Sequence, residues 1–564
     1  MHTFAPSISS NHFMQHLFNP KLMSVLRHGY TKKQFSKDLF AGIIVGIVAL
    51  PLAIAFAVAS GVSPEKGLIT AVVAGLLISV LGGSRVQIGG PTGAFIVIVY
   101  GILQTHGLDG LIISTMMAGV FLILFGLLRM GSLLKFIPHP LIVGFTSGIA
   151  LVIFTTQIKD ALGLEITNLP ADFLPKWGSY FSEINTINPL ALGITVVTIL
   201  ITLFFRKVTT KIPGSFVAIV LITAMVQLLD LPVTTIESVF GEIPRSFQLA
   251  FPSIEFSELG NYLAPALTIA LLGGIESLLS AVVADGMIGG NHRSNTELIA
   301  QGIANVVTPI FGGIPATGAI ARTATNVKNG GRTPVSGIVH AITLLLIMLF
   351  VGQWAKLIPM SCLAGILIVV AYNMSEWRLF ASILKGSGFD ILILLVTFFL
   401  TVLVDLTYAI QIGIVLSALL FMKRMADAGT KTEMEIDSDV LENYETLPEG
   451  LAIYEISGPF FFASAKQYSA TLKSIGQQSK VLIIRMRHVP FIDSTGLHNL
   501  KDVIRDLHHS HTTVILSGVR PEVLKELEKN KVLDLLDQSM ILSTFDLALQ
   551  KANDFLGHKA TFHS

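Results

Sequence analysis

Phe311–Arg322 reads FGGIPATGAIAR, a glycine- and proline-rich approach that runs into an expected helix start. In the first half of the chain, Gly89–Phe95 reads GGPTGAF. Both stretches carry Gly-Gly, then Pro, then Thr-Gly-Ala, and both interrupt an apolar region. Interrupted apolar segments at corresponding places in two halves point to the binding site of a transporter. Because helix N-termini expose unpaired N–H groups, we expect the two half-helices to face each other and hold an anion.

The composition is that of a protein that crosses a membrane many times. Of the 564 residues, 52% are hydrophobic and 13% are charged, and the mean hydropathy is +0.70. Runs such as Ala41–Ala59 approach the length that spans a bilayer. The net charge of +1 gives no indication of nucleic acid, and the single cysteine, Cys362, excludes an intrachain disulfide. The sequence has no metal-ligand cluster and no phosphate-binding Gly-Lys-Ser/Thr loop, so we expect no metal, no cofactor and no ATP hydrolysis.

Apolar segments alternate with charged loops over residues 38–425, the expected transmembrane domain. We count about fourteen segments, about seven in each of two repeats, 38–230 and 262–425. Residues 1–37 form a basic lead-in, and Lys423–Arg424 follow the last segment, so both termini are expected in the cytoplasm. The loops Asp160–Glu183 and Asp230–Glu258 are acidic and are expected outside. Pro51 should bend or break the first segment.

The composition becomes polar at residue 426, which predicts a linker over 426–449 and a soluble α/β domain over 450–564. Asp493-Ser494-Thr495-Gly496 is typical of a helix N-cap, and a phosphate on Ser494 would also be favourable at that helix start. The expected strands are Leu451–Ser457, Val481–Met486 and Thr513–Ser517, and the expected helices are Ala463–Ile475, Thr495–His509, Pro521–Asn530 and Phe545–Phe555.

For three side chains in apolar surroundings, the sequence allows both a functional and a structural role. Arg322 either attracts an anion beside the helix start or is an interfacial arginine that sets topology. Glu276, with Ser280 one turn along, is either a coupling site for H⁺ or Na⁺ or a structural group in a hydrogen bond or ion pair, with Arg322 as a candidate partner. Phe56, near Pro51, either lines the cavity or packs helices together. Asp285, His292 and Arg293 follow the Glu276 segment and are expected in a cytoplasmic loop.

Five stretches together make the chain resemble the SulP (sulfate permease, prestin-like) family of anion transporters with its usual C-terminal STAS domain. Among its members, the stretches look closest to the bacterial branch that imports C4-dicarboxylates such as succinate. The stretches are Ile47–Val62, Gly89–Phe95, Ile275–Met287, Gly312–Asn326 and Asp493–Leu497.

The resemblance implies a UraA-like fold of two inverted seven-segment repeats, divided into core and gate domains, and a homodimer. It places Glu276 and Ser280 where sodium-coupled bicarbonate members carry Asp and Thr, and Glu in place of Asp favours a proton. The STAS domain is expected to help dimerise or regulate, with a cytoplasmic partner or phosphorylation of Ser494 as open possibilities. The resemblance implies an anion site made of Thr92, Gly93, Ala94, Phe95, Thr317, Gly318, Ala319 and Arg322, with Phe56 beside it.

These observations predict a transporter of the bacterial inner membrane and not an enzyme. We expect H⁺-coupled symport of a C4-dicarboxylate or sulfate by movement of the core against the gate. The alternatives are a Na⁺-coupled bicarbonate transporter, an anion exchanger or channel, and a signalling module whose output is the STAS domain.

Overall fold

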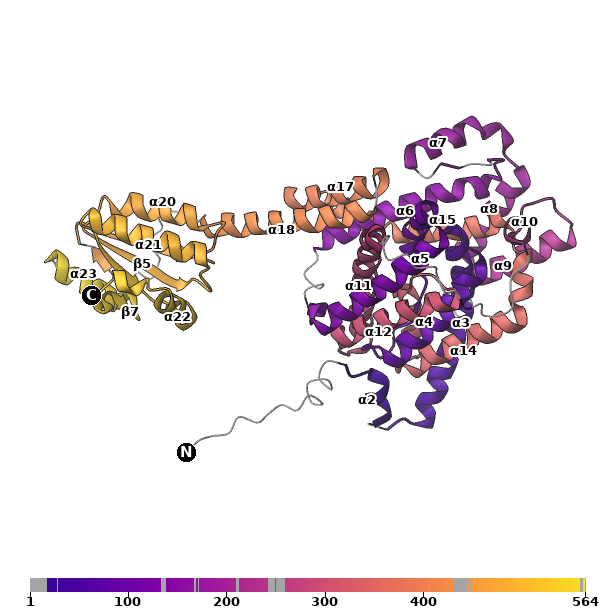
Figure 1. The fold of residues 1–564 in the computed structure, drawn as a ribbon, viewed down its shortest axis with the longest axis horizontal. Helices are drawn as coiled ribbons and strands as arrows, with labels where there is room; N and C mark the ends of the chain where they lie inside the picture. Colours follow the sequence, from indigo (N-terminus) through magenta and orange to yellow (C-terminus); the bar gives the residue numbers. More distant parts are fainter. Residues whose placement is uncertain are drawn as a thin grey trace. The chain divides into compact units, whose positions relative to one another are not determined.

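The computed structural model describes residues 18–27, 29–132, 138–166, 169–170, 172–208, 213–241, 249, 259–404, 406–430, 444–446, 448–557 and 561–562 (Figure 1). Most of the expected linker and of the second acidic loop lies outside these residues. The chain divides into two compact units, Met1–Ile414 and Val415–Ser564.

The helical part has seven described segments in each half. In the first half they are α3 (Lys32–Ala59), α4 (Pro64–Leu81), the two parts of α5 (Phe95–Leu127), α6 (His139–Leu162), α8 (Pro189–Phe204) and α9 (Gly214–Leu228). In the second half they are α11 (Leu259–Ile288), α12 (Ser294–Val307), α13 (Ile320–Lys328), α14 (Val335–Val351), α15 (Met360–Met374), α17 (Gly388–Leu403) and α18 (Leu406–Thr430). Shorter helices are α2 (Lys21–Arg27), α7 (Phe173–Ser182), α10 (Ile236–Phe240) and α16 (Trp377–Ile383).

The segments form two packed groups, which correspond to the expected core and gate. In the core group, α3, α4 and α5 pack against α11, α12, α13 and α14. In the gate group, α6 and α8 pack against α15, and α17 packs against α6. Both interrupted segments belong to the core group, so the candidate site is built mainly on it.

Small residues let the core helices approach closely. A Cβ atom on Gly119 of α5 would lie 2.6 Å from the carbonyl oxygen of Gly302 on α12, and one on Gly302 would lie 2.5 Å from that of Gly119. In a bilayer, such small-residue contacts stabilise helix pairs because they bring backbones into van der Waals contact. The contact fixes α12 beside α5, where α12 supports the site.

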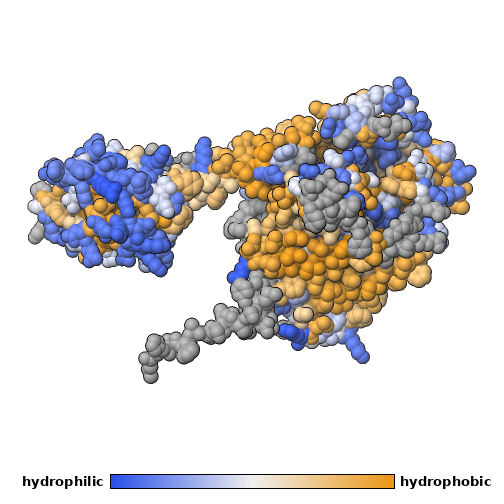
Figure 2. Space-filling model, viewed as in Figure 1, coloured by the Kyte–Doolittle hydropathy of each residue, from blue (hydrophilic) through white to orange (hydrophobic). Residues whose placement is uncertain are grey.

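An apolar band crosses the face of the helical unit that Figure 2 shows. Seven of the described helices are long and apolar enough to cross a membrane, and four shorter apolar helices accompany them. Exposed large hydrophobic side chains lie on the outward faces of several of these helices, for example Leu200, Leu346 and Phe399. The protein is therefore a multi-pass membrane protein, as its composition predicts.

Two local expectations differ from the structure, and a third is met in part. Two of the about fourteen expected segments, which the apolar runs place at 94–103 and 111–128, form one element, α5, in which only Gly107 leaves the helical conformation, at φ 66° and ψ −168°. Helix α3 continues through Pro51, so of the expected bend or break the break does not occur. Asp285 lies in the last turn of α11 and not in the loop that follows, because this helix extends to Ile288.

The second unit contains the α/β domain predicted from the sequence. Four parallel strands form one sheet in the order β4-β5-β6-β7, and the strands β3 and β8 pair separately. The expected strands coincide with β4 and β6, and β5 is longer by two residues. The strands are β3 (Tyr444–Thr446), β4 (Leu451–Ser457), β5 (Val481–His488), β6 (Thr513–Ser517), β7 (Ile541–Leu542) and β8 (Thr561–Phe562), and the helices are α20 (Ala465–Gly476), α21 (Ser494–His509), α22 (Pro521–Lys529) and α23 (Phe545–Leu556).

Candidate functional site

The two interrupted segments meet in the middle of the core group. Gly89–Gly90 (β1) pairs in antiparallel fashion with Thr317–Gly318 (β2), so that Gly89 lies opposite Gly318. The N–H group of Ala319 also donates to the carbonyl of Ile88, at 2.9 Å. Equivalent stretches of inverted repeats run in opposite directions, and the antiparallel pairing follows from that relation. The juxtaposition expected from the sequence is therefore present.

Each short strand leads directly into a helix start that carries N–H groups without an acceptor. At the start of α5, the N–H groups of Phe95 and Ile96 donate to the carbonyls of Thr92 and Gly93, at 3.2 and 3.1 Å. Among the described residues, no acceptor engages the N–H groups of Gly93 or Ala94 at α5, nor those of Ile320 or Ala321 at α13. Such groups, with the positive end of the helix dipole, favour an anion.

Arg322 is buried between these two starts. Its side chain is 3% exposed, and its Nη2 donates to the carbonyl oxygen of Pro91, across the strand pair. Its Nη1 is buried and has no hydrogen-bond partner among the described residues. A buried guanidinium nitrogen without a partner is costly, and an anion bound there would supply the missing acceptor.

Glu276 reaches the site from the middle of α11 and contacts the first interrupted segment. The hydroxyl of Thr92 donates to Oε2 of Glu276, at 2.9 Å, and the Glu276 side chain is only partly buried. Among the described residues, Glu276 and Arg322 are not within ion-pair distance, so the pair that the structural reading allowed is not formed. Thr317, in the second interrupted segment, donates instead to the carbonyl of Gly273 on α11, at 2.6 Å.

Phe56 lies beside the first helix start, as expected for a wall of the site. A Cβ atom on Gly93 would lie 3.6 Å from Cε1 of Phe56 and 2.8 Å from the sulfur of Met374. Met374 ends α15 of the gate group, so Gly93 lies where the core meets the gate. The ring of Phe95 lies against Gly273 of α11, where a Cβ atom would be 3.4 Å from its Cζ.

Ser280 does not face the same space as Glu276. It is fully buried, and its hydroxyl donates to Oγ1 of Thr323 on α13, at 3.2 Å, while that oxygen also accepts from the N–H group of Ile88, at 3.0 Å. Nearby, Nε2 of Gln87 donates to the hydroxyl of Ser277, at 2.8 Å. These contacts tie α11, α13 and the approach to β1 together, and they give Ser280 a positioning role.

A polar stripe on α12, absent from the residues that sequence reasoning selected, holds both approaches to the site. Glu297, Gln301 and Asn305 recur every fourth residue on one face of the helix, and all three are fully buried. The amide of Asn305 accepts from the N–H group of Ala316, at 2.9 Å, and donates to the Ala316 carbonyl, at 2.8 Å, directly before β2. This spacing in an apolar helix is a signal that the sequence does carry.

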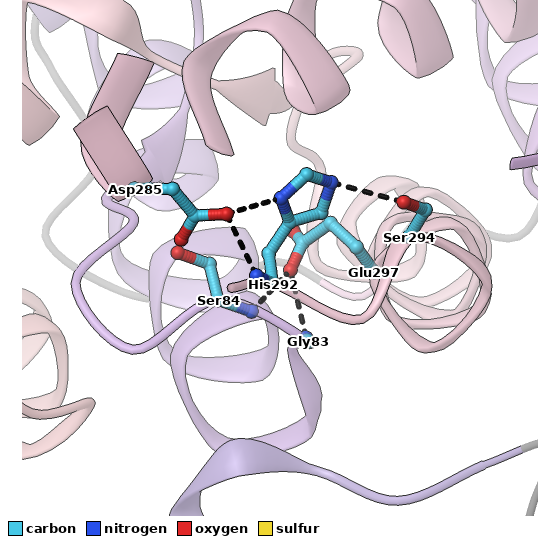
Figure 3. A network of polar contacts seen from close by, with 6 residues as sticks. All are labelled: Gly83, Ser84, Asp285, His292, Ser294 and Glu297. Atoms are coloured by element: carbon cyan, nitrogen blue, oxygen red, sulfur yellow. Dashed lines mark hydrogen bonds and ion pairs between the residues drawn. The ribbon is translucent and has the colours of Figure 1, made fainter. Parts of the chain in front are cut away.

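At its other end, the stripe holds the approach to β1 (Figure 3). Oε2 of Glu297 accepts from the N–H groups of Gly83 and Ser84, at 2.8 and 3.0 Å. Beside it, Asp285 accepts from the backbone N–H of His292, at 2.7 Å, and its carboxylate lies 2.7 Å from Nδ1 of the same residue. The hydroxyl of Ser294 lies 3.0 Å from Nε2 of His292. These contacts close the turn between α11 and α12.

Replacement of Asn305 by aspartate should weaken the approach to β2, because a carboxylate cannot donate to the carbonyl of Ala316. We expect the free energy of unfolding to fall by about 1–3 kcal/mol, the cost of an unsatisfied buried group, and anion transport to fall with it. Thermal unfolding of the purified protein measures this change. Asn499→Asp is the matched control, because Asn499 also donates to the carbonyl four residues earlier but is only partly buried on α21. Equal melting temperatures for both variants would contradict the positioning role of Asn305.

In the second unit, Asp493 caps α21 as the sequence predicts. Its Oδ1 accepts from the N–H group of Gly496, at 2.7 Å, and its Oδ2 accepts from that of Phe462, at 2.9 Å. Ser494 is the first residue of α21 and is exposed. Its position is accessible to a modifying enzyme, and phosphorylation of Ser494 stays a prediction.

Comparisons with known proteins identify both parts of the chain. The model of the sulfate permease family matches residues 35–397, and that of the STAS domain matches residues 445–552. The chain is 43% identical over 505 residues to the putative sulfate transporter YvdB of Bacillus subtilis, covering 89% of this chain and 94% of that protein. It is 31% identical over 548 residues to the bicarbonate transporter BicA of Picosynechococcus, covering 91% and 94%.

Solved structures share the fold. The overall structure of SLC26A9 matches with a TM-score of 0.87 at 18% identity, covering 98% of this chain and 95% of that one. The transmembrane domain of a cyanobacterial bicarbonate transporter, BicA, matches with a TM-score of 0.60 at 30% identity, covering 69% and 98%. These relatives are transporters and not enzymes, and the arrangement of helices is common to them and to this chain.

Proposed function

The chain belongs to the sulfate permease family, and on this premise we propose that it is a secondary transporter that carries a small oxyanion across the bacterial inner membrane together with H⁺. The observation that carries the proposal is the buried Nη1 of Arg322, which has no partner among the described residues and lies between two helix starts with unpaired N–H groups. Together they provide positive potential and several donors at one place.

The substrate class follows from the donors and from the relatives. One guanidinium and backbone N–H groups bind oxygen atoms of a compact anion, and the relatives named above are a putative sulfate transporter and a bicarbonate transporter. Sulfate and bicarbonate are therefore the first candidates, and the C4-dicarboxylate that the sequence resemblance implies is the third. Uptake by proteoliposomes of radiolabelled sulfate, bicarbonate and succinate, each with and without H⁺ and Na⁺ gradients, separates them. Absence of uptake for all three would overturn the proposal.

The geometry supports a mechanism in which the core moves against the gate. Both helix starts and Arg322 belong to the core group, whereas Met374, which lies beside Gly93, belongs to the gate group. An anion held by the core would therefore change its exposure when the two groups slide past each other. Saturable, co-ion-dependent uptake distinguishes this carrier from a channel, which would give large unitary currents.

Glu276 is the proposed proton acceptor. Its carboxylate accepts from Thr92, a neighbour of the N–H groups that would bind the anion. Protonation of Glu276 removes a negative charge beside the bound anion, and by linkage each of the two ligands then favours the binding of the other.

Glu276→Gln should uncouple uptake from the pH gradient. The amide oxygen of glutamine can still accept from Thr92, so we expect the fold and anion binding to persist, but the side chain can no longer take up a proton. Uptake should lose its several-fold stimulation by external acid. Asp390→Asn is the control, because Asp390 is a carboxylate at the start of α17 that accepts from Ser387, at 2.8 Å, and lies in the gate. Acid stimulation that survives in Glu276→Gln would refute the coupling role.

The orientation of the termini, the oligomeric state and a partner for the STAS domain are further proposals. We infer that both termini lie in the cytoplasm, from the basic residues that flank the first and last segments. A homodimer, and a cytoplasmic partner for the STAS domain, rest on the family resemblance. Cross-linking in membranes and protease access in sealed vesicles test them.

A further inference from the structure

Lys176 is a buried lysine far from the α2 end of the helical unit. It lies on α7, at the opposite side of that unit from α2 (Figure 1). Its side chain is 2% exposed, and it is the only buried lysine among the described residues. No carboxylate of the described residues lies within 4.0 Å of its ammonium group. Its Nζ instead lies 5.6 Å from the centre of the ring of Tyr100 on α5.

Two cavities meet at this lysine. A cavity of about 940 Å³ and one of about 440 Å³ are both bordered by Lys176 and Tyr100. Other polar groups on the walls include the amide of Gln157 in the larger cavity and the hydroxyl of Thr155 in the smaller. The hydroxyl of Thr155 has no hydrogen-bond partner among the described residues. The space is therefore large and polar enough for a hydrated small anion.

The cavities lie along the helices that form the central site. Tyr100 is on α5, which starts at Phe95, and a rise of about 1.5 Å per residue puts it roughly 7.5 Å further along the helix. Val58 and Ala59, which border the larger cavity, follow Phe56 on α3. Helices α3 and α5 therefore both run from the central site to the walls of these cavities.

The charges around the cavities favour an anion at Lys176 itself. Asp160 and Glu165 border the larger cavity and Asp172 the smaller. Glu165 and Asp172 are exposed and retain their hydration, and the partly buried Asp160 is not among the charges that shift the pKa of Lys176. Lys176 is buried, and burial lowers the pKa of its ammonium group while nearby Asp172 opposes that change. An oxyanion against Nζ would offset the cost of burying this charge.

We propose that Lys176 and Tyr100 form an outer subsite that captures a small oxyanion on its way to the central site. The proposal rests on the proposed anion transport and adds a second binding position to it. The subsite raises the local concentration of the anion beside the central site, so its loss should increase KM for uptake from the α7 side more than it lowers kcat.

The fluorescence of Trp177, the neighbour of Lys176 on α7, can report anion binding at the subsite directly. It packs against Tyr180, with ring centres 5.9 Å apart, and the chain has three tryptophans in all. The other two, Trp354 and Trp377, are exposed, so Trp354→Phe with Trp377→Phe leaves Trp177 as the sole source of tryptophan fluorescence. The full-length protein in lipid nanodiscs is titrated with sodium sulfate, bicarbonate and succinate at constant ionic strength.

We expect a saturable change in Trp177 fluorescence with at least one of the three anions. Lys176→Met should raise the midpoint about tenfold or more, and Lys176→Arg, which keeps the charge, should stay within about threefold. Lys159→Met is the matched control, because Lys159 borders the same larger cavity but is only partly buried, and its midpoint should not change. A flat signal with all three anions, or an unchanged midpoint in Lys176→Met, would overturn the subsite.

Arg322→Ala in the same background separates this inference from the proposed function. The Trp177 response should persist with an unchanged midpoint, because the outer subsite does not include Arg322. Loss of the response in Arg322→Ala would assign the signal to the central site and overturn the inference. If Trp177 fluorescence responds to an anion but the protein shows no uptake, the transport proposal is refuted and the subsite stands. If the protein transports the anion and Lys176→Met leaves KM unchanged, the subsite is refuted and the transport proposal stands.

Discussion

Replacement of Arg322 by alanine is expected to weaken anion binding by about a hundredfold and to abolish uptake at substrate levels near the wild-type Kd. The guanidinium is 3% exposed, is held by the carbonyl of Pro91, and leaves Nη1 without a partner among the described residues. Alanine removes the buried positive charge and the donor together. Isothermal titration of the protein in nanodiscs with the transported anion measures the loss of affinity.

Two further variants make the Arg322 result specific. Arg322→Lys keeps a charge but loses the planar fork that contacts Pro91 and the anion at once, so an intermediate affinity is expected. Arg332→Ala is the matched control, because Arg332 also donates to backbone carbonyls, those of Val327 and Gly331, but is exposed. Wild-type affinity in Arg322→Ala would remove Arg322 from the site.

Gly90→Ala should abolish transport although it adds a single methyl group. Gly90 has φ +143°, where a side chain is strained, and a Cβ atom there would lie 2.6 Å from Nη1 of Arg322. The substitution therefore distorts β1 and displaces the arginine. We expect a loss of about 1–3 kcal/mol in the free energy of unfolding and no detectable uptake, as measured by thermal unfolding and proteoliposome assay.

Gly101→Ala is the control for this second result. Gly101 lies on the same element, α5, in helical conformation, and a Cβ atom there would have nothing within 4 Å. Alanine at such a position stabilises a helix by roughly 0.5–1 kcal/mol, so this variant should unfold at an equal or higher temperature and transport normally. Normal transport by Gly90→Ala would show that the strand pair does not position the site.

The sequence predicted the architecture because its signals are local. Glycine and proline interrupt the two half-helices visibly, and the predicted strands Leu451–Ser457 and Thr513–Ser517 coincide with β4 and β6. The meeting of the two interrupted segments also followed, because equivalent stretches of inverted repeats face each other across one axis.

The contacts inside the site were less predictable because they depend on how helices rotate against one another. The sequence allowed an ion pair between Glu276 and Arg322, whereas in the structure Glu276 accepts a hydrogen bond from Thr92. Ser280 shares a helix face with Glu276 by spacing, but it bonds to Thr323. Glu297 was not selected from the sequence, although its four-residue spacing to Gln301 carried the signal.

The outer cavity could not be found from sequence at all. Lys176 lies in a loop region that reads as polar and acidic, and nothing in the local pattern shows that its side chain is buried against Tyr100. That contact joins α7 to α5 and depends on the packing of the whole unit.

A density map of the protein with its transported anion at saturation tests the central claim most directly. The account predicts density for the anion between the starts of α5 and α13, within hydrogen-bonding distance of the N–H groups of Gly93 or Ala94 and of Nη1 of Arg322. An anion bound elsewhere, with Arg322 contacting only the carbonyl of Pro91, would contradict it.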